Sequence, residues 1–168
     1  MLYIKKHWKS GLLNIIIVLA VYQAVQFYHA RNTPNGMAPP ISGRLLDGQL
    51  FSLTAVKERP MLVHFWATWC GVCRLEQDSI DRLAKDFPVI AVASQSGTTQ
   101  ELINTVAQRG ITVPVLLDEH GRLARAFGVN AYPTTFVIGK NNEIYDVEVG
   151  YTTEFGFRFR LWMASLIN

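Results

Sequence analysis

Apolar residues along this chain cluster into short runs that are separated by polar turns. Nearly continuous apolar runs are typical of parallel strands that are buried on both faces of a sheet. The predicted strands are MLVHFW (61–66), VIAVAS (89–94), PVLLD (114–118), TTFVIG (134–139) and EIYDVEVG (143–150). The last two are expected to pair as a hairpin, because only a short polar turn, residues 140–142, separates them.

Helical patterns fall between these strands. Helices are predicted from Cys70 to Asp86, over residues 98–110 and over residues 120–129. Thr98 is a suitable N-cap for the second of these, and Gly110 a suitable stop signal. Strands that alternate with helices predict an α/β fold, in which helices cover both faces of a central mixed sheet.

The two ends of this region are less regular. RLLDGQLFSL (44–53) has an Asp-Gly pair between two apolar segments, which predicts a leading hairpin. The tail allows two interpretations. FGFRFRL (155–161) alternates as a strand would, whereas Phe155, Phe159 and Trp162 recur at the spacing of one helix face.

A separate apolar run precedes the domain. Residues 11–28 carry no charge, and as a helix they would be about 27 Å long, close to the thickness of a bilayer core. Lys5, Lys6 and Lys9 come before this run, and positive charge stays on the cytoplasmic side. The pattern therefore predicts a membrane anchor over residues 1–30. The chain would cross the bacterial inner membrane once, with its domain in the periplasm.

A cleaved signal peptide is the alternative to an anchor. It requires a small-residue cleavage site after a short apolar core, and only VLA at 18–20 offers a weak one. The next stretch, RNTPNGMAPP (31–40), is rich in proline and glycine and is expected to be a linker without regular structure. The globular domain is then predicted to occupy residues 41–168.

Composition narrows the classes of function. The chain has 168 residues, 49% of them hydrophobic, which is enough for one globular domain with its own core. Four of its 16 Lys and Arg residues lie in residues 1–31, which contain no acid, so the remainder carries 12 against 13 Asp and Glu. The domain is therefore nearly neutral, and we expect no nucleic-acid partner.

The chain has only two cysteines, Cys70 and Cys73, with two residues between them. A structural zinc site needs four ligands, and the sequence offers no second pair; two thiolates alone suit only a soft ion such as copper(I). A purely structural disulfide across so short a loop would add little stability. We therefore expect no metal site, although a copper-binding module remains an alternative.

Redox chemistry is the third interpretation, and it fits the context best. Cys70 would lie where a strand and a turn lead into a helix, so unpaired N–H groups would stabilise its thiolate. A thiolate is the species that attacks a disulfide. Cys73 lies one helical turn further on, where it can resolve the mixed disulfide that forms.

At this point the chain resembles a known family, the thioredoxins. FWATWCGVC resembles their strand and active-site turn, and YPTT (132–135) resembles their loop with a cis proline. WCGVCRLE, LLDEHGRLARAFGVNAYPTTFVI and the hairpin around LLDGQLFSL resemble the membrane-anchored, TlpA-like periplasmic thioredoxins. Within that group the chain is similar to the thioredoxin-like proteins of suppressor-of-copper-sensitivity clusters. The resemblance covers about residues 40–168.

The resemblance implies a thioredoxin fold and a thiol–disulfide oxidoreductase that needs no cofactor beyond its cysteine pair. It implies client proteins with disulfides or thiols as partners, and a membrane electron donor that keeps the pair reduced. Reduction of clients is the expected direction, and donation of disulfides is the alternative. Trp69, Tyr132 and Pro133 are expected to contact the client, with a cis bond before Pro133.

Three positions depart from the thioredoxin pattern. His64 stands where the family has a buried Asp, Val72 where it often has Pro between the cysteines, and Asp78 where it often has a helix-kinking Pro. Resolution needs a base to take the proton of Cys73. Glu76 and His64 are both suitably placed, and the sequence leaves the choice between them open.

Overall fold

The computed structural model describes residues 11–17, 20–21 and 36–167. The chain divides into two compact units, residues 1–31 and 32–168. In the first unit, residues 11–17 are helical. Across the described ranges, no helix is both long and apolar enough to cross a membrane. Most of the predicted anchor lies outside the described residues, so the transmembrane helix stays a prediction.

The second unit alternates strands and helices as the apolar pattern predicts. Its helices are α2 (Gly71–Leu83), α3 (Thr99–Arg109), α4 (Arg122–Ala126) and α5 (Glu154–Ile167). Its strands are β1 (Gly36–Met37), β2 (Ser42–Arg44), β3 (Leu50–Ser52), β4 (Met61–Trp66), β5 (Val89–Ser94), β6 (Val115–Asp118), β7 (Thr134–Ile138) and β8 (Glu143–Val149). The bounds of β4 and β5 are those of the two apolar runs.

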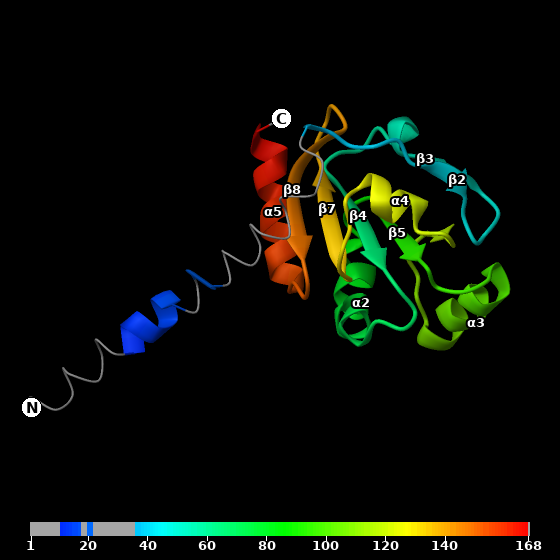
Figure 1. Cartoon of the computed structure of the whole chain (residues 1–168). Helices are drawn as coiled ribbons and strands as arrows, with labels where there is room; N and C mark the ends of the chain where they lie inside the picture. The colour runs from blue at the N-terminus through cyan, green and yellow to red at the C-terminus, as the bar shows by residue number, and fades with distance from the viewer. Residues whose placement is uncertain (1–10, 18–19, 22–35, 168) are drawn as a thin grey trace, which may run out of the picture. The chain divides into compact units, whose positions relative to one another are not determined.

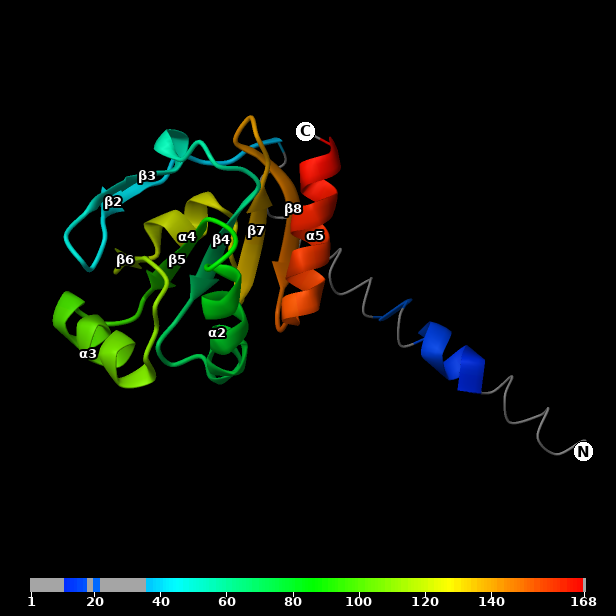
Figure 2. The same ribbon diagram turned by 180° about the vertical axis from the view of Figure 1, so that it is seen from behind.

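Six of the strands form one sheet in the order β1-β8-β7-β4-β5-β6. β4 is parallel to β5 and antiparallel to β7, and β7 is antiparallel to β8, so the sheet is mixed. β2 and β3 form a separate antiparallel hairpin, as predicted around Asp47-Gly48. The arrangement places β4 at the centre of the sheet, with the start of α2 directly after its carboxyl end (Figure 2).

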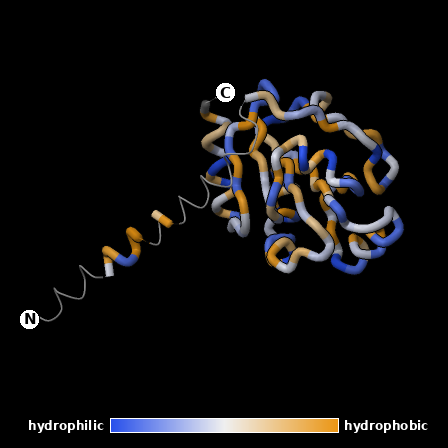
Figure 3. Tube along the Cα trace, viewed as in Figure 1, coloured by the Kyte–Doolittle hydropathy of each residue, from blue (hydrophilic) through white to orange (hydrophobic). Residues whose placement is uncertain are grey.

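Each face of the sheet has its own hydrophobic core. Side chains alternate along a strand, so Leu62 and Trp66 lie on the face covered by α2, α3 and α5, whereas Val63 and Phe65 face α4 and the hairpin. His64 shares the face of Leu62 and Trp66, as the alternation predicts. Figure 3 shows the apolar residues gathered along the inner strands and the polar ones in the outer turns.

Two helix boundaries confirm the predicted signals. Thr98 caps α3 through a capping box with Glu101, and Gly110 ends it with a left-handed φ of +63°, a conformation that glycine adopts without strain. α2 ends at Leu83, three residues before the predicted end. α4 covers only part of the predicted 120–129 helix.

The linker prediction is wrong at residues 36 and 37. Gly36 and Met37 form β1, which pairs with Ile144 and Glu143 of β8. Gly36 adopts φ +88°, a conformation that glycine reaches without strain. The proline- and glycine-rich composition therefore does not exclude a strand, because pairing with β8 defines it.

The tail is a helix, not a strand. α5 buries Phe157, Leu161 and Ala164 against the sheet. Phe155, at the start of the apolar stripe that favoured a helix, is 78% exposed, so the stripe lies on the outer face. Apolar residues on both faces of α5 explain why the sequence pattern fits two structures.

Candidate active site

The two cysteines lie where β4 passes into α2. Cys70 is the N-cap of α2, in an extended conformation, and its Sγ accepts a hydrogen bond of 3.0 Å from the backbone N–H of Cys73. A disulfide joins Cys70 to Cys73, with 5.3 Å between their Cα atoms. Cys70 is 7% exposed and Cys73 1%, so Cys70 is the more accessible sulfur. In the reduced state, the same N–H group would stabilise a Cys70 thiolate.

The turn between β4 and Cys70 is tied to neighbouring elements. The backbone N–H of Thr68 donates to Ser96 Oγ at 3.1 Å, and Arg109 of α3 donates to the Thr68 carbonyl at 2.7 Å. The indole N–H of Trp69 donates to the carbonyl of Gln95 at 3.1 Å. These bonds join the turn to the end of β5 and to α3, and so they fix the position of the turn that leads into Cys70.

The predicted client-contact residues come together beside this turn. The rings of Trp69 and Tyr132 meet edge to face, with 5.6 Å between their centroids. Trp69 is 65% exposed, while Tyr132 is half-buried and Pro133 is buried. The Tyr132–Pro133 bond is cis, as expected. A contact of these residues with a client stays a prediction.

Glu76 of α2 and His64 of β4 meet in the core between the helix and the sheet. Glu76 lies on α2 three residues after Cys73, and both side chains are fully buried. Glu76 Oε2 lies 3.7 Å from His64 Nδ1, which also forms a 2.8 Å hydrogen bond with Thr135 Oγ1. Glu76 Oε1 accepts a 2.6 Å bond from the backbone N–H of Thr152. The structure therefore joins the two candidate bases into one buried cluster.

Burial shifts the pKa values of Glu76 and His64 in opposite directions. It raises the pKa of Glu76 to about 7, against the lowering effect of the Thr152 N–H bond, and the charge of Glu148 raises it further. Burial lowers the pKa of His64 to about 4, partly offset by Asp81. A base with a pKa near the working pH accepts a proton more effectively than one of low proton affinity. Glu76 is therefore the better placed base near neutral pH.

Sequence reasoning missed three polar residues around this cluster. Thr135 lies opposite both His64 and Glu148 in the sheet, so the three side chains form one row across β4, β7 and β8. Thr152, in the loop after β8, donates its hydroxyl to Glu148 Oε2 at 3.2 Å. The alternation of β8 could have shown that Glu148 and Asp146 share a face, but only the register places Glu148 in that row.

Comparison with known proteins identifies the family. The redoxin family model matches residues 33–156. The chain belongs to the redoxin family. It is 31% identical to the thioredoxin-like protein YneN of Bacillus subtilis over 89% of this chain and 93% of YneN. It is also 27% identical to the thiol-disulfide oxidoreductase ResA of the same organism, over 87% of this chain and 86% of ResA.

Similar solved structures support the same fold. A putative thiol:disulfide interchange protein DsbE from Chlorobium tepidum matches with a TM-score of 0.70 and 26% identity, over 79% of this chain and 98% of that one. A putative thioredoxin from Neisseria meningitidis has a TM-score of 0.70 and 28% identity, over 79% of this chain and 92% of that one. The thioredoxin fold and the resemblance to TlpA-like proteins are therefore confirmed.

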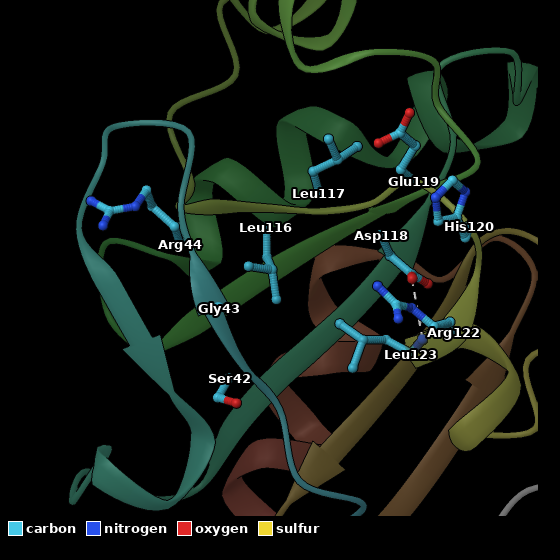
Figure 4. A pocket seen from close by; sticks show the side chains of 10 residues that line it. All are labelled: Ser42, Gly43, Arg44, Leu116, Leu117, Asp118, Glu119, His120, Arg122 and Leu123. Atoms are coloured by element: carbon cyan, nitrogen blue, oxygen red, sulfur yellow. Dashed lines mark hydrogen bonds between the residues drawn. The ribbon is translucent and has the colours of Figure 1, made fainter.

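A cavity of about 400 Å³ lies away from the cysteine pair, between the hairpin and α4 (Figure 4). It contains none of the predicted site residues. Its one buried acid, Asp118, is already occupied, because it accepts the backbone N–H groups of Leu123 and Ala124 and the hydroxyl of Ser94. Within the described part of this redoxin, no group of three or more His, Cys, Asp or Glu side chains could hold a metal ion.

Proposed function

We propose that this protein is a membrane-tethered thiol–disulfide oxidoreductase that reduces disulfides of client proteins in the periplasm. The observation that carries the chemistry is the placement of Cys70 as the N-cap of α2, with Cys73 one turn behind it and more deeply buried. Membership in the redoxin family and the names of ResA and the DsbE-type protein support the same reaction. The tether rests on the uncharged run of residues 11–28 and on the lysines before it.

The reaction proceeds in two exchanges. The Cys70 thiolate attacks one sulfur of the client disulfide, which forms a mixed disulfide and releases a client thiolate. The Cys73 thiolate then attacks Cys70 Sγ, which forms the Cys70–Cys73 disulfide and releases the second client sulfur. The client gains two electrons and the enzyme loses two. The cysteine pair carries these electrons itself, and a membrane electron donor then restores the dithiol.

Glu76 supplies the base for the second exchange. Burial of Cys73 disfavours its thiolate, so a nearby group must take the proton. With a pKa of about 7, Glu76 is partly ionised near neutral pH and can accept it. His64, with a pKa of about 4, is neutral under the same conditions and holds a proton only weakly. His64 therefore packs beside the Glu76 carboxylate as a neutral side chain and does not act as the base.

Apolar side chains around the cysteine pair suit a protein client. Trp69 is 65% exposed, Val72 43% and Leu75 74%, and all three lie within five residues of Cys70. Exposed apolar groups gathered on one surface are typical of protein-interaction sites. A client segment that covers them would bring its disulfide to Cys70.

Electron transfer to a disulfide-bonded protein tests the proposal. The reduced full-length protein in detergent is mixed with an oxidised protein substrate, and the free thiols on each partner are counted with time. We expect transfer from the wild type and none from Cys70→Ser. The equilibrium potential against glutathione gives the direction: a potential below that of the periplasmic clients supports reduction. Tight binding of one copper ion by both thiols, without exchange, would contradict the proposal.

A further inference from the structure

The buried polar row across β4, β7 and β8 extends beyond the two candidate bases. Glu148 of β8 is only 6% exposed, and the proposed exchange reaction assigns it no role. It lies opposite Thr135, which in turn lies opposite His64. A buried carboxylate is costly unless it is paired and hydrogen-bonded, so its position needs a reason.

Two groups hold Glu148 in place. Its Oε1 forms an ion pair with the Arg160 guanidinium of α5, which also contacts Asp146 Oδ2 at 2.8 Å. Its Oε2 accepts the Thr152 hydroxyl at 3.2 Å. Both oxygens are therefore satisfied, and the pair links the sheet, α5 and the loop between them.

Thr152 connects this carboxylate to the proposed base. Its hydroxyl donates to Glu148, while its backbone N–H donates to Glu76 Oε1 at 2.6 Å. One residue thus bridges two buried carboxylates through two different donors. Because the hydroxyl bond fixes the residue, it also fixes the direction of the N–H group. The second oxygen of Glu76 has no hydrogen-bond partner among the described residues, so Thr152 is the main polar contact of that carboxylate.

We propose that Glu148 is a positioning residue for the reaction of the cysteine pair, and that it acts on Glu76 through Thr152 and through its charge. The proposal rests on the role of Glu76 given above. The two routes have opposite effects. The negative charge of Glu148 favours the protonated form of Glu76, whereas the N–H bond that Thr152 directs at Glu76 favours its ionised form.

The charged and titratable groups around Glu76 come from each element packed against it. β4 contributes His64, β8 contributes Glu148, and α5 contributes Arg160 through its ion pair with Glu148. Asp81 of α2 acts on His64. His64 is neutral near pH 7, because burial lowers its pKa to about 4. Of these groups, Glu148 is the one whose charge raises the pKa of Glu76.

Titration of the Glu76 carboxyl carbon by NMR, in the oxidised full-length protein, tests this without turnover. Glu148→Gln keeps an oxygen that accepts the Thr152 hydroxyl but removes the charge, so we expect the Glu76 midpoint to fall by on the order of one pH unit. Thr152→Val removes the anchoring hydroxyl, so we expect the midpoint to rise. Thr152→Ser keeps the hydroxyl and is expected to restore the wild-type midpoint.

Glu143→Gln, on the same strand, is the matched control and should leave the midpoint unchanged. A midpoint that stays fixed in both Glu148→Gln and Thr152→Val, while only stability falls, would show that the row is structural and would overturn the proposal. If Glu148→Gln does not fold, the comparison of Thr152→Val with Thr152→Ser decides: a raised midpoint in the first and a wild-type midpoint in the second support the proposal, and equal midpoints overturn it. Because the titration needs no client, loss of disulfide exchange would count against the proposed function and not against this inference.

Discussion

His64 shows how one buried residue changes the chemistry around a cysteine pair. It lies on the face of β4 that α2 covers, at the position where the thioredoxin pattern has a buried Asp. A neutral imidazole there leaves Glu76 as the only fully buried carboxylate in contact with the row from α2. Under the proposed mechanism, proton transfer falls to Glu76 on α2, the helix that carries Cys73, and not to the central strand.

Replacement of Glu76 tests this assignment at the level of one atom. Glu76→Gln keeps the shape and the bond from the Thr152 N–H but cannot accept a proton. We expect resolution of the mixed disulfide near neutral pH to slow by about 10²–10⁴-fold, the usual contribution of a general base. Raising the pH should restore part of the rate, because hydroxide then ionises Cys73 directly. Stopped-flow measurement across pH checks this.

His64→Leu is the matched comparison for that experiment. It should reduce the rate less than Glu76→Gln does, because His64 only packs beside the base. If His64→Leu is slow while Glu76→Gln behaves as the wild type, the base is His64. If neither variant is slow, water reaches Cys73 directly.

The same pKa shifts predict how stability depends on pH. Glu76 has a folded-state pKa of about 7, above its ordinary value of 4.5, so ionisation favours the unfolded state as pH rises between these values. The wild type should therefore lose about 3 kcal/mol relative to Glu76→Gln across this window. Urea unfolding of both oxidised proteins at pH 4 and pH 8 measures the difference. Parallel stability curves would contradict the buried carboxylate.

His64 predicts a loss of stability in the opposite direction of pH, as the pH falls. Its folded-state pKa of about 4 lies below the ordinary 6.5, so protonation favours the unfolded state as pH falls through this range. We expect His64→Leu to lose less stability than the wild type between pH 6.5 and pH 4. Urea unfolding at these two pH values checks it, and an equal loss in both proteins would show that His64 is not buried neutral.

At the scale of the element, α5 is apolar on two faces that play different roles. Phe157 is fully buried, whereas Phe155 is 78% exposed on the same helix. Phe157→Ala is expected to cost about 3–5 kcal/mol, as for other buried phenylalanines. Phe155→Ala should change stability by about 0.5 kcal/mol or less. Urea denaturation of both variants provides a matched pair, and equal losses would show that α5 packs in another orientation.

Elements whose pattern has one meaning could be predicted from the sequence. β4 and β5 are continuous apolar runs, and α3 has both a capping box and a terminal glycine. β1 could not be predicted, because a two-residue strand has no periodicity and is defined only by its partner β8. The site divides in the same way. Cys70 and Cys73 are visible as a motif. The link from Glu76 to Glu148 depends on strand register and on Thr152 in the loop after β8, and neither can be predicted from the local sequence.

At the scale of the whole molecule, the apolar run before the domain predicts where the reaction takes place. If residues 11–28 cross the membrane with Lys5, Lys6 and Lys9 inside, the domain lies in the periplasm. A reporter that is active only outside the cytoplasm, fused after Asn168, is expected to be active. An inactive fusion would contradict the topology. Soluble protein that lacks residues 1–20 would support a cleaved signal peptide instead.

In the proposed reaction Cys70 attacks the client disulfide and Cys73 resolves the mixed disulfide, and trapping of mixed disulfides distinguishes these roles. Cys73→Ala removes the resolving thiol, so this variant should accumulate mixed disulfides between Cys70 and its clients, identified by mass spectrometry of the linked peptides. Cys70→Ala should trap none, because Cys73 is nearly inaccessible. Trapping by Cys70→Ala and none by Cys73→Ala would reverse the roles and contradict the account.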